Sequence, residues 1–188
     1  MQSRQMDLML LRVFQQQVLL QCRYVLVSAK YLQDANQHHD TVAVFYAIQN
    51  LLTAAANVAK ALWGQKGSKA VDRGALRLSI GVNDSSPLRL VTMRNNFEHF
   101  DDRLDKWWRD SFRHNHADLN IGPKDAIAGL DDIDRFRMFD PTSTDVIFWG
   151  ETFNLNALID EVARICPLLE EEANRPHWEP SPGQRTEP

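Results

Sequence analysis

Three polar side chains near the middle of the 188-residue sequence have the types and spacing of a phosphodiester-cleaving group: Arg94, Asn95 and His99. Histidine titrates near ~6.5, so at neutral pH it can accept or deliver a proton. Arginine presents a planar, permanently charged group that matches phosphate oxygens, and the Asn95 amide can orient either the phosphate or the imidazole. Because RNA supplies its own nucleophile, the 2′-hydroxyl, such a group can cleave RNA without a metal ion.

A single helix over 86–110 is predicted to position these residues. It begins at Ser86 and Pro87, a capping hydroxyl followed by proline at the first helical position. Apolar residues then recur at spacings of three and four, which predicts one buried stripe: Leu90, Met93, Phe97, Phe100, Leu104 and Trp107. Asn95 and His99 are four apart and should lie one turn apart beside that stripe.

The rest of the chain predicts a mainly α protein. Apolar periodicity predicts helices over 5–32, 40–62 and 154–169, with Asp40 or Thr41 and Asn154 or Asn156 as caps, and a short helix within the connection 65–83. Alternating residues at 135–139 and 144–149 predict a β-hairpin. The predicted fold is an antiparallel four- to five-helix bundle with this small β-hairpin (135–149) inserted before the last helix, as one domain over 1–175. Residues 176–188, rich in Pro, Glu and Ser, are predicted to be a disordered tail.

Composition limits the classes of partner. The net charge of −4 and pI near 5.8 argue against broad electrostatic attraction to nucleic acid, although a local basic site is compatible with them. Cys22 and Cys166 form no paired spacing and are predicted to be two reduced, packed thiols, with a disulfide between them as the alternative. No targeting segment is visible, and no run approaches the ~18 apolar residues of a membrane span, so the predicted location is cytoplasmic, without membrane attachment.

The segment Arg94-Asn95-Asn96-Phe97-Glu98-His99 resembles the R-x(4–6)-H motif of the HEPN ribonuclease-like superfamily, in which a polar residue often follows the arginine directly, as Asn95 does. The resemblance implies an antiparallel bundle of four or five helices that cleaves RNA as a metal-independent, cofactor-free endoribonuclease. It also implies a homodimer in which the two motifs meet across a shared cleft. Many such proteins are toxins paired with an antitoxin protein, or act in antiphage defence.

On this resemblance His99 would be the general acid/base, Arg94 would bind the scissile phosphate, and Asn95 would orient one of them. A second hypothesis is a non-catalytic helical dimerisation or protein-interaction module, in which Arg94 and Trp108 contact a partner. A third is a metal-dependent hydrolase that uses His114 and His116, with the nearby carboxylate of Asp118.

Overall fold

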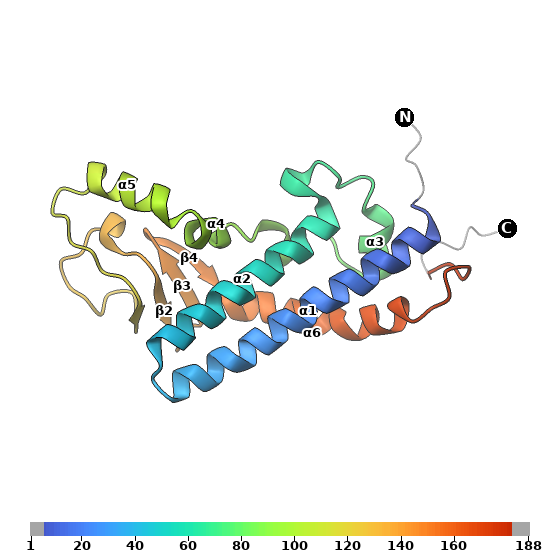
Figure 1. Cartoon of the computed structure of the whole chain (residues 1–188), viewed down its shortest axis with the longest axis horizontal. Coiled ribbons are helices and arrows are strands. Elements are labelled where there is room, and N and C mark those ends of the chain that lie inside the picture. The colour runs from blue at the N-terminus through green and yellow to red at the C-terminus, as the bar shows by residue number, and fades with distance from the viewer. Residues whose placement is uncertain (1–5, 182–188) are drawn as a thin grey trace. The chain divides into compact units, whose positions relative to one another are not determined.

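The computed structural model describes residues 6–181, and this part of the chain is mainly helical, with 60% helix in six α-helices (Figure 1). A small four-stranded mixed sheet precedes the last helix. The helices are α1 (Leu8–Gln37), α2 (Thr41–Trp63), α3 (Gly74–Ser79), α4 (Met93–Glu98), α5 (Phe100–Asp110) and α6 (Leu155–Ala173), and the strands are β1 (Asn120–Ile121), β2 (Met138–Asp140), β3 (Asp145–Phe148) and β4 (Glu151–Asn154). Three short 3₁₀ helices lie at Gln65–Gly67, Pro87–Leu90 and Asp132–Asp134.

Side-chain caps fix where the long helices begin. The Asp7 carboxylate accepts a hydrogen bond from the backbone N–H of Met9 at 2.9 Å, and α1 begins there. Asp40 accepts from Ala43 at 3.0 Å and Asn154 from Ala157 at 2.9 Å, so both predicted caps are confirmed. Helix α1 continues five residues beyond its predicted end at 32, because 33–37 contains no glycine or proline to stop it.

The prediction of one helix over 86–110 is wrong. The segment forms a 3₁₀ turn, then α4 and α5, which meet at His99, whose backbone (φ −102°, ψ 44°) is not helical. Two carboxylates in the first turn of α5, Asp101 and Asp102, favour a new helix start there, because acidic residues are stabilised at helix N-termini. The break divides the predicted stripe: Met93 and Phe97 are buried, whereas Leu90, Phe100 and Leu104 are exposed.

The chain divides into two compact units. Among the described residues, the first unit comprises 6–27, 53–91 and 158–181, and the second comprises 28–52 and 92–157. The division passes through α1, α2 and α6, each of which contributes to both units. The single domain over 1–175 stays a prediction.

The core of the first unit is helical. It is built from fully buried apolar residues of α1, the second half of α2, α3 and α6, among them Leu11, Val18, Val58, Leu76, Val162 and Ile165. Both cysteines are in this core as buried free thiols, as predicted from their apolar surroundings. The thiols of Cys22 (α1) and Cys166 (α6) also hydrogen-bond to each other, a proximity that their sequence spacing does not reveal.

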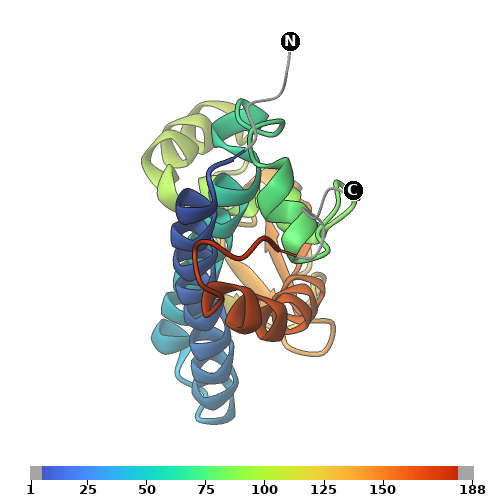
Figure 2. The same ribbon diagram turned by 90° about the vertical axis from the view of Figure 1, so that its right-hand side faces the viewer.

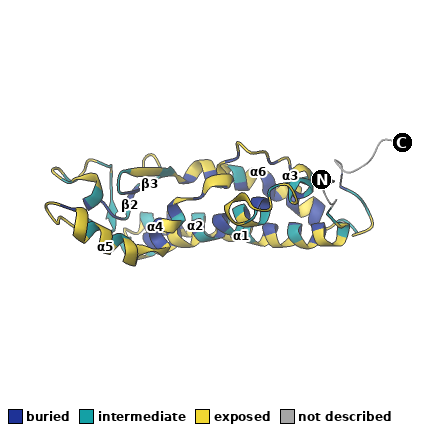
Figure 3. Ribbon diagram, turned by 90° about the horizontal axis from the view of Figure 1, so that it is seen from above, coloured by how far each residue is buried: buried dark blue, intermediate teal, exposed yellow. Residues whose placement is uncertain are grey.

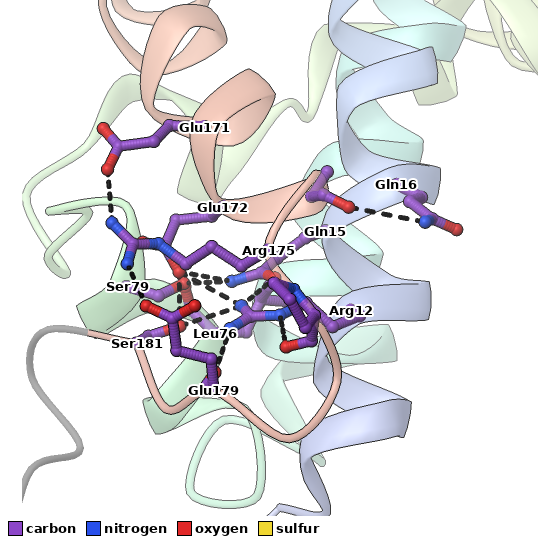
Figure 4. A network of polar contacts seen from close by, with 12 residues as sticks. Arg12, Gln15, Gln16, Leu76, Ser79, Glu171, Glu172, Arg175, Glu179 and Ser181 are labelled. Carbon is purple, nitrogen blue, oxygen red and sulfur yellow. Dashed lines mark hydrogen bonds and ion pairs between the residues drawn. The ribbon is translucent and has the colours of Figure 1, made fainter.

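A buried polar network also belongs to the first unit (Figure 4). The Arg12 guanidinium lies 3.1 Å from the Glu172 carboxylate, and both side chains are about 95% buried. Arg12 also donates to the side chains of Gln15 at 2.7 Å and Ser181 at 3.0 Å, and to the Glu179 carbonyl. These contacts join the start of α1 to the end of α6 and the segment after it, which lie side by side in Figure 2.

This network changes the expectation for the C-terminal residues. Residues 176–181, which the sequence assigns to a disordered tail, are held by α1 and α6, and Ser181 is fully buried. The reason is the buried charge of Arg12, which requires more acceptors than Glu172 alone provides. The remainder of the predicted tail, 182–188, lies outside the described residues.

The sheet belongs to the second unit. Its order is β1-β2-β3-β4, with β1 parallel to β2 and the other neighbours antiparallel. The predicted hairpin corresponds to β2 and β3, paired through Phe139 and Val146. β1 and β4 were not anticipated, because β1 has only two residues and β4 (Glu-Thr-Phe-Asn) has a single apolar residue, so neither shows an alternating pattern. Three consecutive residues of β3 are buried, Val146, Ile147 and Phe148, so this strand is covered on both faces.

Helix α2 is the most apolar element. The range Thr41–Gly67 is long and apolar enough, by length and composition, to cross a membrane, which the sequence reading did not anticipate. Its most apolar window is 56% buried within the protein, as is typical of a core helix. Cytoplasmic location stays a prediction.

Candidate functional site

The motif arginine lies on α4 and is held by the motif itself. The Arg94 guanidinium is 2.6 Å from the Glu98 carboxylate, one turn along the helix, and donates to the Asn95 amide oxygen at 3.1 Å. The Arg94 side chain retains 19% of its accessible surface, and Asn95 is exposed. An ion pair of this spacing near the surface contributes only a few tenths of a kcal/mol, so an incoming phosphate can compete for the guanidinium.

The motif histidine stands at the junction of α4 and α5. Its backbone N–H donates to the Asn95 carbonyl at 3.0 Å, which keeps His99 one turn after Asn95 even though α4 ends there. Its side chain is exposed, and its ring has no hydrogen-bond or ion-pair partner among the described residues. The predicted one-turn relation of Asn95 and His99 is therefore confirmed, with an imidazole open to solvent.

The second asparagine of the motif has a different role. Asn96 is buried, donates to the Glu151 carboxylate of β4 at 3.1 Å, and accepts from the Arg103 side chain of α5 at 3.0 Å. This side chain connects α4, α5 and the sheet within the second unit. No sequence signal distinguishes Asn96 from the adjacent Asn95, and Arg103 and Glu151 gain their roles only through tertiary contacts with Asn96.

Trp149, in the turn between β3 and β4, contacts α5 close to the junction of α4 and α5. Arg103 and Lys106 both lie over the Trp149 ring, at 5.5 and 5.2 Å from its centroid, at distances typical of cation–π contacts. Trp149 (φ 51°) and Gly150 (φ 77°) form a two-residue turn between β3 and β4, both at positive φ. A side chain at position 150 would not fit, because a Cβ there would lie 2.6 Å from the Asp132 carboxylate. Large residues are rare at positive φ, so the neighbouring contacts hold this turn in place.

Trp107 anchors α5 to a buried acid. Its indole N–H donates to the Asp134 carboxylate at 3.0 Å, and the Ser111 hydroxyl donates to the same oxygen at 2.7 Å. Asp134 is fully buried. The adjacent Trp108 is 66% exposed.

His114 and His116 do not form the metal site considered from the sequence. The Nε2 of His114 donates to the Trp108 carbonyl at 2.9 Å, and the His116 ring packs between Trp107 and Phe136, with centroids 5.1 and 4.5 Å away. Across the described residues 6–181, no group of three or more His, Cys, Asp or Glu side chains is placed to hold a metal ion. The His114 ring is therefore held by the Trp108 backbone, and the His116 ring by its aromatic neighbours Trp107 and Phe136.

A shallow depression of about 510 Å³ lies between 115–120 and 127–130, also in the second unit. The carboxylate that lines it, Asp118, is paired with Arg137 through two hydrogen bonds, one of them 2.8 Å long. Burial alone raises the pKa of Asp118, but the hydrogen bonds and charge of Arg137 outweigh it and hold the pKa below its usual value. A carboxylate already neutralised in this way is a weak candidate for ligand binding or acid/base chemistry.

The motif group is thus the better candidate for chemistry: a guanidinium and an amide in contact, an open imidazole one turn away, and a buried amide that fixes the junction. No protein-family model matches the sequence, and no curated protein or solved structure is significantly similar to it.

Proposed function

We propose that this protein is a HEPN-type endoribonuclease that cleaves RNA without a metal ion, with Arg94, Asn95 and His99 as its catalytic group. The observation that carries the proposal is the exposed His99 ring one backbone turn after Asn95, which contacts Arg94, on a junction held by the Asn96 amide. A residue with no structural partner on a fixed backbone is available for chemistry. The proposal includes the family fold, in which the helices of this mainly helical protein form an antiparallel bundle of four or five helices.

The proposed reaction uses the RNA itself as the nucleophile. A histidine removes the proton from the 2′-hydroxyl, whose oxygen attacks the adjacent phosphorus while the bond to the 5′-oxygen breaks and that oxygen receives a proton. The products are a 2′,3′-cyclic phosphate and a 5′-hydroxyl. Arg94 stabilises the charge that develops on the phosphate oxygens.

A symmetric dimer would supply a second histidine, so that one acts as base and the other as acid. The same proposal includes RNA as substrate in the cytoplasm and a role as a toxin, with an antitoxin protein as partner, or in defence.

Cleavage of total RNA and tRNA in EDTA by the wild type and His99→Ala tests the proposal. We expect His99→Ala to lower the rate by roughly 10²–10⁴-fold, the typical contribution of a positioned acid or base. His38→Ala is the matched control, since His38 is also an exposed histidine of the second unit, and it should cleave like the wild type. Equal cleavage by His99→Ala and wild type would remove the assignment.

A second candidate function is a non-catalytic protein-interaction module. It is favoured by the exposed aromatic residues of α5 and the segment after it, Phe100, Trp108 and Phe112, the last of which is 93% exposed. On this reading neither RNA is cleaved, and Trp108→Ala abolishes binding of a partner. Metal-independent cleavage that leaves cyclic phosphate ends would exclude this candidate.

A further inference from the structure

Helix α1 carries an apolar stripe on the face turned away from its own core. Five residues of this stripe belong to the first unit, Leu10, Val13, Leu20, Tyr24 and Val27, with exposed fractions from 38% for Leu20 to 67% for Val27. Figure 3 shows exposed residues recurring along the length of α1. Single exposed apolar residues are ordinary, but a continuous row on one face indicates a binding surface.

The spacing of the row is that of a coiled coil. With exposed Gln17 included, the positions follow one another at intervals of three, four, three, four and three. The buried face of the same helix repeats separately through Leu11, Val18 and Val25. Helix α1 is therefore apolar on two faces, and the outer face has the seven-residue repeat with which one helix packs against another over about 26 Å.

The electrostatics of α1 favour a partner that is as uncharged as the stripe itself. Between residues 10 and 27 the only charged side chains are Arg12 and Arg23. Arg12 is buried against Glu172, and Arg23 is paired with Glu170 at 3.1 Å. Two copies of this face would therefore meet without like-charge repulsion, whereas a strongly charged partner would find no complement on it.

We propose that a second copy of this chain binds along the stripe, α1 against α1. A row spaced by threes and fours needs a partner with the same repeat, and no other described helix exposes such a row of comparable length. Gln17 lies within the row, and a single polar residue in such a seam selects the register of the two helices. This interface lies in the first unit, whereas Arg94, Asn95 and His99 lie in the second, so it is a different contact from the one in which the two motifs of the proposed ribonuclease would meet.

Charged substitutions within the stripe test the proposal on the full-length chain. One variant carries Val13→Lys with Val27→Lys, and another carries Val13→Glu with Val27→Glu; both positions are exposed, and circular dichroism checks that the helix content is kept. Sedimentation equilibrium should show a wild-type dimer and two variants that dimerise on the order of 10²-fold more weakly, since each loses apolar burial on both copies. An equimolar mixture of the two variants should regain the dimer, because opposite charges then face each other.

The matched controls are Gln33→Lys and Gln33→Glu, which place the same charges on an exposed position of α1 outside the row and should leave the dimer unchanged. A monomeric wild type would overturn the proposal, as would a dimer that persists in both charged variants. A mixture that stays monomeric would show that the two stripes do not face each other. A monomeric wild type would also remove the second histidine from the proposed mechanism, whereas the effect of His99→Ala on cleavage is measured separately and does not depend on the α1 contact.

Discussion

Two arginines, one in each unit, show how the same side chain can serve structure or remain available for chemistry. Arg12 in the first unit is about 95% buried, and its donors reach Glu172, Gln15, Ser181 and backbone carbonyls. Arg94 in the second unit keeps 19% of its side-chain surface, and its side-chain polar partners among the described residues are its helical neighbours Glu98 and Asn95.

The difference lies in what each guanidinium would lose if its partner left. Arg12 has no access to water, so loss of Glu172 would leave an uncompensated buried charge. Arg94 would regain water or a phosphate in place of Glu98. The Arg12–Glu172 pair therefore stabilises the fold, whereas a phosphate could replace Glu98 as the partner of Arg94.

The largest effect should come from Arg12. We expect Arg12→Ala to lower the free energy of unfolding by about 3–5 kcal/mol, because the Glu172 carboxylate stays buried without its counter-charge. Urea denaturation followed by circular dichroism measures this change. The double variant Arg12→Met with Glu172→Met should recover most of the stability, since no charge is then buried alone; a double variant less stable than Arg12→Ala would contradict this account.

Arg94→Ala should show the opposite profile. We expect RNA cleavage to slow by roughly 10²–10³-fold, as when one group that stabilises developing charge is removed. The free energy of unfolding should change by only a few tenths of a kcal/mol, the typical value of an ion pair one turn apart on a helix. A variant that cleaves normally, or that unfolds much more easily, would place Arg94 with Arg12 as a structural residue.

The second unit also contains a buried charge, Asp134, which sharpens the comparison. Trp107→Phe removes the indole donor at 3.0 Å and leaves Ser111 as the remaining donor to that oxygen. We expect a loss of about 1.5–3 kcal/mol in the free energy of unfolding, the typical contribution of one hydrogen bond to a charged group. Trp108→Phe is the control, because Trp108 is exposed and its indole makes no hydrogen bond among the described residues; equal effects of the two substitutions would argue against the buried contact.

The smallest effect concerns the thiol pair of the first unit. The hydrogen bond from Cys22 stabilises the Cys166 thiolate and outweighs burial, so the pKa of Cys166 falls to about 7, while the pKa of Cys22 is raised by the same contact and by burial. Since the pKa of Cys166 is lower in the folded chain than in the unfolded chain, its ionisation adds stability as the pH rises through about 7, and this is lost as the pH falls.

Iodoacetamide labelling followed by peptide mass spectrometry measures this pKa. Labelling of Cys166 should increase with a midpoint near pH 7. Cys22→Ala removes the donor and should raise that midpoint toward the ordinary thiol value of ~8.5. An unchanged midpoint in Cys22→Ala would show that the two thiols do not interact.

The sequence predicted the features that depend on near neighbours in the chain. The caps at Asp40 and Asn154 and the backbone relation of Asn95 to His99 join residues three or four positions apart. Such contacts follow from helix geometry alone, so the pattern of residue types is sufficient. The predicted roles of Arg94, Asn95 and His99 in catalysis stay predictions.

Tertiary structure decided what depends on residues far apart. Asn96 rather than Asn95 is buried because Glu151, 55 positions later, accepts its hydrogen bond. Arg12 is buried because Glu172 lies beside it, 160 positions away, and the two cysteines meet although 144 positions separate them (166 − 22). Local propensity cannot choose among such partners, because burial and the need to pair buried polar groups arise only when distant segments pack together.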